Sequence, residues 1–284
     1  MLLAIPNVSE GRDARAIEAI GAAFDARLLD VHSDPDHHRS VFTLAGAPGG
    51  LAGAVCSGAA EVIRQIDVGR HEGIHPRVGA IDVAPIVYLD PADRGAACAE
   101  ALVLGDLLGH RLELPVFMYG ELAQGRTRAE LRRGGPAALA QRIDAGELRP
   151  DFGPRRLHPS AGAVLVAARP PLVAFNVELA SPATLDDAKA IASRIREGGA
   201  DGLPGVRAIG LWLAARGVAQ VSTNVEDHRR VPLAEVVAAI ARHAVPSQAE
   251  LVGLAPRAAF EGFPDDLPVA NRRTVEDALA ERGA

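Results

Sequence analysis

The sequence has little of several features that would assign a protein to a specialised class. Only two of its 284 residues are cysteines, Cys56 and Cys98, which excludes a disulfide framework and predicts two buried, reduced thiols. No apolar run approaches the roughly 18 consecutive residues of a membrane span, and the start of the chain lacks the basic region of a signal peptide. These absences predict a cytoplasmic protein that does not enter a membrane.

Aromatic residues and an excess of positive charge are also missing. Aromatics make up 4% of the chain, so Ala, Val, Leu and Ile must fill most of the core that a hydrophobic content of 48% provides. The formal net charge of −6 argues against a nucleic-acid-binding protein, which needs a basic surface. We therefore expect one large globular domain or two of ordinary size.

The second part of the chain has a clear order of elements. It predicts a hairpin from the short link between its two middle strands, and a helix with Ser181 as N-cap and Pro182 as first residue. This β-α-β-β-α-β order is typical of the split βαβ unit, a four-stranded antiparallel sheet with helices on one face. The predicted strands span residues 172–179, 206–213, 218–225 and 250–254, and the predicted helices residues 181–198 and 233–243.

The first part opens with the same order and adds further elements. We therefore predict an α/β (α+β) protein of two related sandwich subdomains, residues 1–171 and 172–284, joined by the stiff Arg169-Pro170-Pro171 segment. Residues 120–151 show no clear pattern. The predicted strands span residues 2–6, 27–32, 40–45, 81–89 and 115–119, and the predicted helices residues 12–24, 50–66 and 95–110.

His71-Glu72-Gly73-Ile74-His75 has the spacing of the H-E-x-x-H zinc-protease signature. That signature needs a helix, whereas Gly73 disfavours a helix and Pro76 biases His75 away from helical backbone angles. The segment is therefore interpreted as a loop that leads into a strand, where a histidine is well placed to transfer protons.

The same segment carries a resemblance to a known family. Residues 73–82 are similar to the G-E-H-P-R-M-G-A-L-D segment of glutamate formiminotransferases, folate-dependent enzymes of histidine breakdown and one-carbon metabolism. Further similar blocks follow in the family's order over nearly the whole chain, at residues 5–11, 115–121, 150–154, 174–179, 219–224 and 251–256.

The resemblance implies a fold and an activity. The family's fold is two ferredoxin-like βαββαβ subdomains with a ligand groove between them, which agrees with the order of elements above. The implied enzyme is a formimidoyltransferase that moves a formimino group between glutamate and N5 of tetrahydrofolate. Tetrahydrofolate is then the co-substrate, no metal is expected, and the protein is expected to form a homodimer.

The resemblance also assigns candidate residues. His75 aligns with the family's catalytic histidine and would act as general acid and base, because only histidine has an unperturbed pKa near 6.5. Arg77 is predicted to bind a substrate carboxylate, and Asp82 either orients an imidazole or caps the strand entry. Other candidate substrate-binding residues are Asn7, Ser9 and Glu10, which are also interpreted as a helix N-cap, and the polar strand residues Asn176, Ser222 and Asn224.

A Gly/Pro-rich segment aligns with the family's folate-binding region. Such a loop lets backbone groups approach a flat pterin closely, and its arginines suit the anionic glutamate tail. The predicted folate-binding residues are Gly153, Pro154, Arg155, Arg156, Leu157, His158, Pro159, Ser160, Ala161 and Gly162.

The chain departs from the family's pattern at four positions. His32, Glu72, Ile74 and Ala161 stand where aspartate, lysine, glutamate and tryptophan are frequent. Two alternatives follow, a folate-binding homologue that uses another donor such as 5-formyltetrahydrofolate, or one without turnover. A third alternative is a metal-dependent hydrolase that uses the His/Asp residues at positions 32–38 and 71–75.

Overall fold

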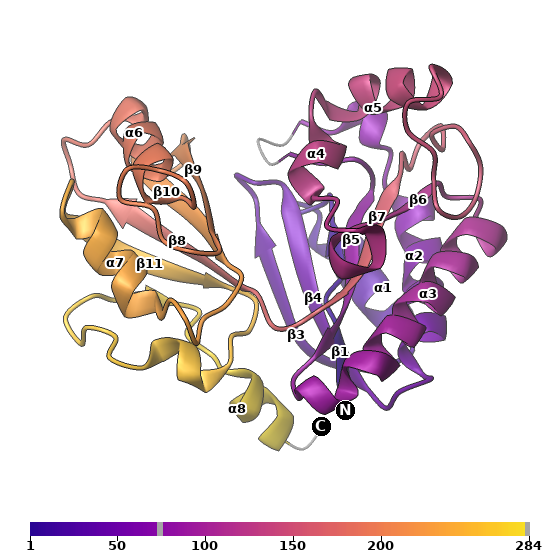
Figure 1. Cartoon of the computed structure of the whole chain (residues 1–284), viewed down its shortest axis with the longest axis horizontal. Coiled ribbons are helices and arrows are strands. Elements are labelled where there is room, and N and C mark those ends of the chain that lie inside the picture. The colour runs from indigo at the N-terminus through magenta and orange to yellow at the C-terminus, as the bar shows by residue number, and fades with distance from the viewer. Residues whose placement is uncertain (73–75, 282–284) are drawn as a thin grey trace. The chain divides into compact units, whose positions relative to one another are not determined.

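The chain folds as two units, which are described separately. The structure is a computed structural model that describes residues 1–72 and 76–281. Unit 1 comprises Met1–Arg169 and unit 2 comprises Pro170–Ala284, so the division falls at the start of the double proline (Figure 1).

Unit 1 contains a mixed sheet with helices on both faces. Its strands are β1 (Leu2–Ala4), β2 (Asn7–Val8), β3 (Arg27–Asp34), β4 (Arg39–Gly46), β5 (Ile81–Tyr88), β6 (Val116–Met118) and β7 (Val164–Arg169). Its α-helices are α1 (Ala14–Ala23), α2 (Leu51–Gln65), α3 (Arg94–Arg111), α4 (Arg128–Arg132) and α5 (Gly135–Asp144).

The first part of unit 1 has the predicted βαββαβ topology. β1 and β2 both lie between β4 and β5 and run antiparallel to them, and β3 pairs with the far side of β4. The single strand predicted over residues 2–6 is interrupted, because Pro6 has no N–H to donate to a neighbouring strand. β7 then extends the sheet parallel to β5, and β6 pairs with β7.

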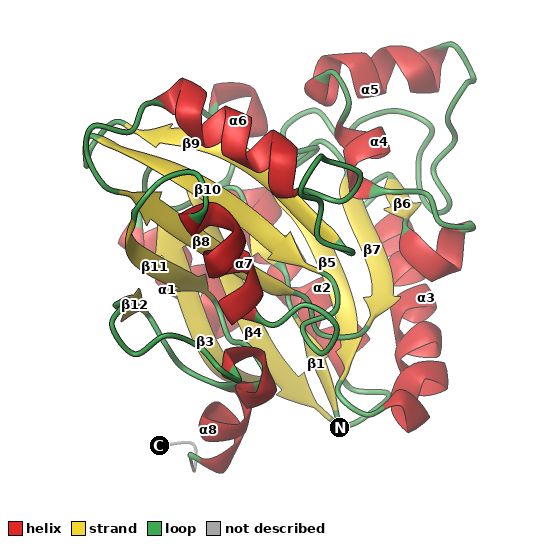
Figure 2. Cartoon of the chain, turned by 60° about the vertical axis from the view of Figure 1, so that its left-hand side comes forward, coloured by secondary structure: helices red, strands yellow, loops and turns green. Residues whose placement is uncertain are grey.

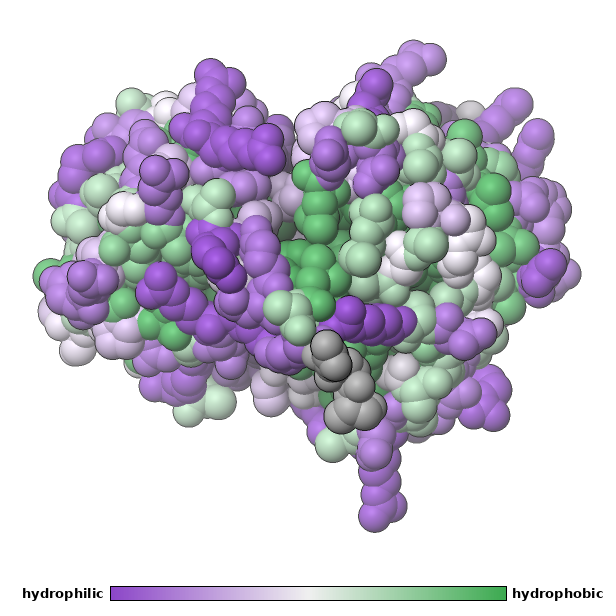
Figure 3. Space-filling model, turned by 90° about the horizontal axis from the view of Figure 1, so that it is seen from below, coloured by the Kyte–Doolittle hydropathy of each residue, from purple (hydrophilic) through white to green (hydrophobic). Residues whose placement is uncertain are grey.

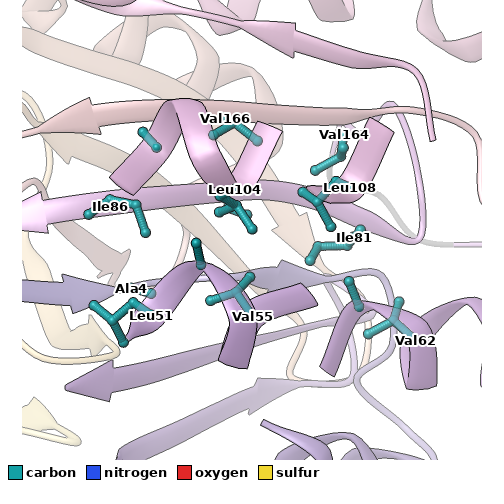
Figure 4. Packing of buried hydrophobic residues seen from close by; sticks show 14 of the residues in the cluster. Ala4, Leu51, Val55, Val62, Ile81, Ile86, Leu104, Leu108, Val164 and Val166 are labelled. Atoms are coloured by element: carbon teal, nitrogen blue, oxygen red, sulfur yellow. The ribbon is translucent and has the colours of Figure 1, made fainter. Parts of the chain in front are cut away.

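Different helices cover the two faces of the unit 1 sheet. Leu104 and Leu108 of α3 pack on Val164 and Val166 of β7, in a layer that α2 shares (Figure 4). The other face is covered over β5, β6 and β7 by α4 and α5, which lie in the stretch where the sequence has no clear pattern. β7 was missed in the prediction.

Unit 2 is a second βαββαβ sheet with added C-terminal elements. It comprises the strands β8 (Val173–Leu179), β9 (Val206–Leu213), β10 (Val218–Val225), β11 (Pro246–Val252) and β12 (Val269–Ala270), and the α-helices α6 (Leu185–Ile195), α7 (Leu233–Ala241) and α8 (Val275–Ala280).

The topology of unit 2 confirms the predicted split βαβ unit. β11, β8, β10 and β9 lie in that order, and each adjacent pair is antiparallel. α6 and α7 pack on one face of this sheet, where Val177, Val221 and Leu251 belong to one core (Figure 2).

The predicted start of the second part's first helix is wrong. α6 begins at Leu185, and its N-cap is Thr184 rather than Ser181. Thr184 Oγ1 accepts the Asp187 N–H, while the Asp187 carboxylate accepts the Thr184 N–H, so the two residues form a reciprocal capping box.

The exposed surface carries hydrophilic and apolar residues side by side. On the face drawn in Figure 3, hydrophilic residues are spread widely, with smaller apolar areas between them. In the part of the chain that the structure describes, no helix has the length and apolar character that crossing a membrane requires.

Close packing of α6 on β9 depends on a glycine in the strand. A Cβ atom at Gly210 would lie 2.2 Å from the Lys189 backbone nitrogen of α6. We predict that Gly210→Ala lowers the free energy of unfolding by about 1–3 kcal/mol, because a helix backbone must move away. Urea denaturation measures the change, and Gly53→Ala in α2 is the control, since open space surrounds Gly53. Unchanged stability in Gly210→Ala would contradict this packing.

Candidate functional site

The segment singled out in the sequence lies where the chain enters β5. Its described residues include His71, which follows a short 3-10 helix, and Arg77 to Asp82. The predicted acid/base residue His75 lies outside the described residues, together with Gly73 and Ile74. The structure therefore shows how the residues on either side of His75 are held.

The N-terminal side of this segment is held by a pair of stacked histidines. The His71 ring lies on the His38 ring with centroids 4.3 Å apart, and His71 Nε2 donates to the His38 carbonyl at 2.9 Å. His38 Nδ1 accepts the Gly11 N–H at 3.1 Å and lies 3.4 Å from Glu10 Oε1. Because that nitrogen accepts a hydrogen bond, this arrangement requires a neutral His38.

Both histidines are less basic than usual. Burial lowers the pKa of His38 below 6.5, and His71 lowers it further, while Glu10 acts in the opposite direction. Burial also lowers the pKa of His71, although its bond to the His38 carbonyl opposes this. The pair is therefore neutral at physiological pH.

The C-terminal side of the segment is held by Arg77 and Asp82. Arg77 Nη2 donates to the His71 carbonyl at 2.6 Å, which joins the two described ends of the segment. Asp82 is 2% exposed, accepts the Val78 N–H at 2.8 Å and forms an ion pair with Arg132. Of the two roles predicted for Asp82, the structure shows the one at the strand entry.

Two residues after β2, Ser9 and Glu10, form hydrogen bonds in this region. Ser9 Oγ donates to the Gly79 carbonyl at 2.8 Å, and Glu10 Oε1 accepts the N–H groups of Gly11 and Arg12. The expectation that Asn7 or Ser9 caps the first helix is wrong, because Asp13 is the N-cap of α1 and accepts two N–H groups of the first turn.

Next to Asp82 lies a group of arginines that the sequence did not reveal. We call Arg39, Arg128 and Arg132 the arginine cluster. Arg39 donates to Asn7 Oδ1, and Arg132 is paired with Asp82. Burial lowers the pKa of Arg39 to about 9; Asp82 opposes this, and the positive charges of Arg132 and Arg128 add to it.

Tyr119 completes this region. Arg128 lies over its ring, with the guanidinium carbon 5.8 Å from the ring centroid. The Tyr119 side chain is buried, and within the described part of the chain its hydroxyl has no hydrogen-bond partner. A signal for Arg39 existed in the sequence, because strand alternation places it on the face of β4 opposite the core residues Phe42 and Leu44.

The predicted folate-binding segment packs directly on the segment that precedes β5. Gly162 has a φ of +70°, and a Cβ atom there would lie 2.4 Å from the Val78 carbonyl oxygen. A Cβ atom at Gly79 would lie 2.0 Å from the Ala163 carbonyl oxygen. Only glycine permits this approach, which brings together two segments about 80 residues apart.

Residues 158–162 of this segment form a closed turn. His158 and Gly162 exchange backbone hydrogen bonds of 2.9 Å, and His158 Nδ1 accepts the Ala161 N–H. The Ala161 side chain is fully buried in the core of unit 1, so it fills space there. Arg155 and Arg156 are exposed.

The three predicted residues of unit 2 lie on one face of its sheet. Asn176 and Ser222 are direct neighbours on β8 and β10, and Asn224 follows two residues along β10. This is the face opposite α6 and α7. Asn176 Nδ2 donates to Glu250 Oε2 at 3.2 Å.

Two polar residues on the same face were not predicted. Gln220 is fully buried, and neither of its side-chain polar atoms has a hydrogen-bond partner in the described part of the chain. Burial raises the pKa of the neighbouring Glu178, an effect that Arg216 opposes and Glu250 reinforces. Gln220 is likewise a polar residue in the otherwise apolar strand that carries Ser222 and Asn224, so the same signal applied to it.

The described His and Asp residues of the proposed hydrolase site are used in other ways. Asp34 Oδ2 lies 2.8 Å from His37 Nδ1; burial would raise the pKa of Asp34, but the bond and charge of His37 lower it to about 2. Across residues 1–72 and 76–281, no three His, Cys, Asp or Glu side chains gather in a way that could hold a metal ion. This finding does not favour the hydrolase alternative.

Comparison with known proteins gives one consistent result. Residues 1–169 match the formiminotransferase domain, N-terminal subdomain, and residues 174–261 match the formiminotransferase domain. The glutamate formimidoyltransferase of Thermoplasma acidophilum is 34% identical over 270 residues, which cover 90% of this chain and 88% of the relative. That of Streptococcus pyogenes serotype M1 is 35% identical over 236 residues, 81% of this chain and 78% of the relative.

Longer relatives match over the same region. The formimidoyltransferase-cyclodeaminase of Sus scrofa is 37% identical over 271 residues, which cover 89% of this chain and 49% of the relative. The chain therefore spans about half the length of the formimidoyltransferase-cyclodeaminases that it matches.

The two stacked histidines make a testable contribution to stability. The folded-state pKa of each lies below the 6.5 of an unperturbed histidine, so the unfolded chain binds protons more readily. Their contribution is present above about pH 6.5 and lost as the pH falls through that value toward the folded-state pKa. We predict that the free energy of unfolding falls less steeply between about pH 7 and pH 5 in His38→Asn than in the wild type.

Urea denaturation at several pH values measures this difference. Asparagine suits the test because it tolerates the positive φ of 49° at position 38 and keeps an acceptor for the Gly11 N–H. His110→Asn, at an exposed position of α3, is the matched control. Equal slopes for the wild type and His38→Asn would show that the pair does not titrate as described.

Proposed function

Because the chain belongs to the formiminotransferase domain family, we propose that it transfers a formimino group between glutamate and N5 of tetrahydrofolate. Both the Thermoplasma and the Streptococcus relatives are named glutamate formimidoyltransferase, and the chain covers most of each. Tetrahydrofolate is the co-substrate in this proposal, and the reaction belongs to histidine catabolism.

One structural observation carries the proposal. The segment with the family's histidine motif and the segment that resembles its folate-binding region are in backbone contact through Gly79 and Gly162. A reaction between a folate and a second substrate requires the acid/base group and the folate-binding loop to be neighbours. The contact between the two segments therefore supports the proposal.

We assign the proton transfers to His75. The attack of N5 on the formimino carbon gives a tetrahedral intermediate, in which one nitrogen loses a proton and the other gains one. A histidine near its usual pKa can do both. The neighbouring His38 and His71 do not suit this role, since both are engaged in hydrogen bonds to the backbone and have lowered pKa values.

The remaining assignments follow from the sequence. Arg77 and Asp82 hold the described ends of the His75 segment, which supports a positioning role for both. Tetrahydrofolate would bind at residues 153–162, and the helix-free face of the unit 2 sheet, with Asn176, Ser222 and Asn224, would supply polar substrate contacts. The cytoplasmic location and the homodimer stay predictions.

Replacement of His75 tests the proposal. We expect His75→Ala to lower the transfer rate by about 10²- to 10⁴-fold, because general acid/base catalysis contributes that much. Binding of tetrahydrofolate, measured by calorimetry, should be retained. His110→Ala, which removes a surface histidine of α3, should keep the wild-type rate. A His75→Ala enzyme with the full rate would exclude the assigned role.

The donor is identified by a paired assay of the wild type. Formiminoglutamate with tetrahydrofolate is compared with 5-formyltetrahydrofolate with glutamate. Turnover of the first pair supports the proposal, whereas turnover of the second pair alone identifies a formyl donor. Tetrahydrofolate binding without turnover of either pair would show a folate-binding protein and refute transfer.

A further inference from the structure

We propose that the arginine cluster (Arg39, Arg128 and Arg132), together with the Tyr119 hydroxyl, binds the two carboxylates of the glutamate-type substrate. This inference rests on the proposed function and extends it, because it names the residues that would recognise the donor. The residues come from β4, from α4 and from the position directly after β6, all within unit 1.

The electrostatics of the cluster favour an anion. Burial disfavours the charged form of Arg39; the negative charge of Asp82 opposes this effect, and the positive charges of Arg132 and Arg128 add to it. Asp82 is also near Arg77, whose charge it stabilises. One buried carboxylate is thus shared among several guanidinium groups, and a ligand with two carboxylates would balance the remaining positive charge.

Buried hydrogen-bond donors without an acceptor also favour an anion-binding site here. Arg132 binds Asp82 through Nη2, while its Nε is buried and has no hydrogen-bond partner in the described part of the chain. The buried Tyr119 hydroxyl also has no hydrogen-bond partner in the described part of the chain. Buried donors are normally satisfied, and both residues act electrostatically on Arg39, so these two groups indicate a place where a ligand supplies the acceptors.

The cluster lies beside the segment that would carry out the reaction. Asp82, which pairs with Arg132, also accepts the Val78 N–H on the C-terminal side of the His75 segment. α4, which carries Arg128 and Arg132, lies on the face of the sheet opposite α1, α2 and α3 (Figure 1). On that face Asn7 binds Arg39, so the cluster continues into the predicted substrate-binding residues after β2.

Two sources can supply a glutamate dicarboxylate, the amino-acid substrate and the tail of the folate. The structure favours the amino acid, because the predicted folate segment carries exposed arginines of its own, Arg155 and Arg156. The fork of a guanidinium matches a carboxylate with two parallel hydrogen bonds, which gives discrimination against the corresponding amide.

The test measures binding of N-formimino-L-glutamate and L-glutamate by calorimetry. Arg128→Gln is the main variant, because Arg128 has a cation–π contact with Tyr119 and is not the partner of Asp82. We expect about 10- to 100-fold weaker binding of both compounds, the loss typical of a hydrogen bond to a charged group. Arg133→Gln, an exposed neighbour at the end of α4, is the matched control and should bind as the wild type does.

Tyr119→Phe distinguishes binding from a structural role. It removes a hydroxyl without a partner, so thermal stability should stay the same or rise, while dicarboxylate binding weakens. A structural role alone would leave binding unchanged. Glutamine, which keeps only one carboxylate, should bind to the wild type more weakly than glutamate does and should lose less affinity in Arg128→Gln.

The outcomes separate this inference from the proposed function. Wild-type affinity for both glutamate compounds in Arg128→Gln overturns the inference, even if transfer occurs. Weaker binding of p-aminobenzoyl-L-glutamate alone assigns the cluster to the folate tail and also overturns it. Cluster-dependent glutamate binding without any transfer supports the inference and contradicts the proposed transfer.

Discussion

The close backbone contact between residues 78–80 and 161–163 positions the rest of the unit 1 site. Ala80 donates to the Ala161 carbonyl at 2.9 Å, and Ala163 donates to the Val78 carbonyl at 3.0 Å. The two chains can approach this closely because Gly79 and Gly162 have no Cβ. The bridge between Gly79 and Gly162 is antiparallel, and β5 and β7, which follow it, pair in parallel, so the contact fixes the spacing of the two candidate segments where both strands begin.

Charged groups in this region serve the fold and the candidate site together. Asp82 fixes the strand entry through the Val78 N–H and anchors α4 through Arg132. The ion pair and the hydrogen bond offset the desolvation cost of burying this carboxylate. The arginines around it are less well balanced, which is typical of places where a ligand completes the electrostatics.

The sheets of the two units have a similar distribution of helices and polar residues. In each, the βαββαβ order places helices on one face, and polar residues gather on the part of the other face that helices leave uncovered. In unit 1 this face carries Arg39 and Asn7, and in unit 2 it carries Asn176 and Gln220. The strand alternation that places them on this face also explains why single polar residues in apolar strands are informative in the sequence.

Hydrophobic periodicity and turn residues determined the order of elements and the split βαβ topology, because these signals are local. The family's motifs likewise lie in short contiguous segments, which made His75 and residues 153–162 recognisable. Only the tertiary structure decided that β7 joins β5, and that Arg39, Arg128 and Arg132 meet beside Asp82. These features depend on contacts between residues far apart in the chain, and the spacing of residue types carries no information about them.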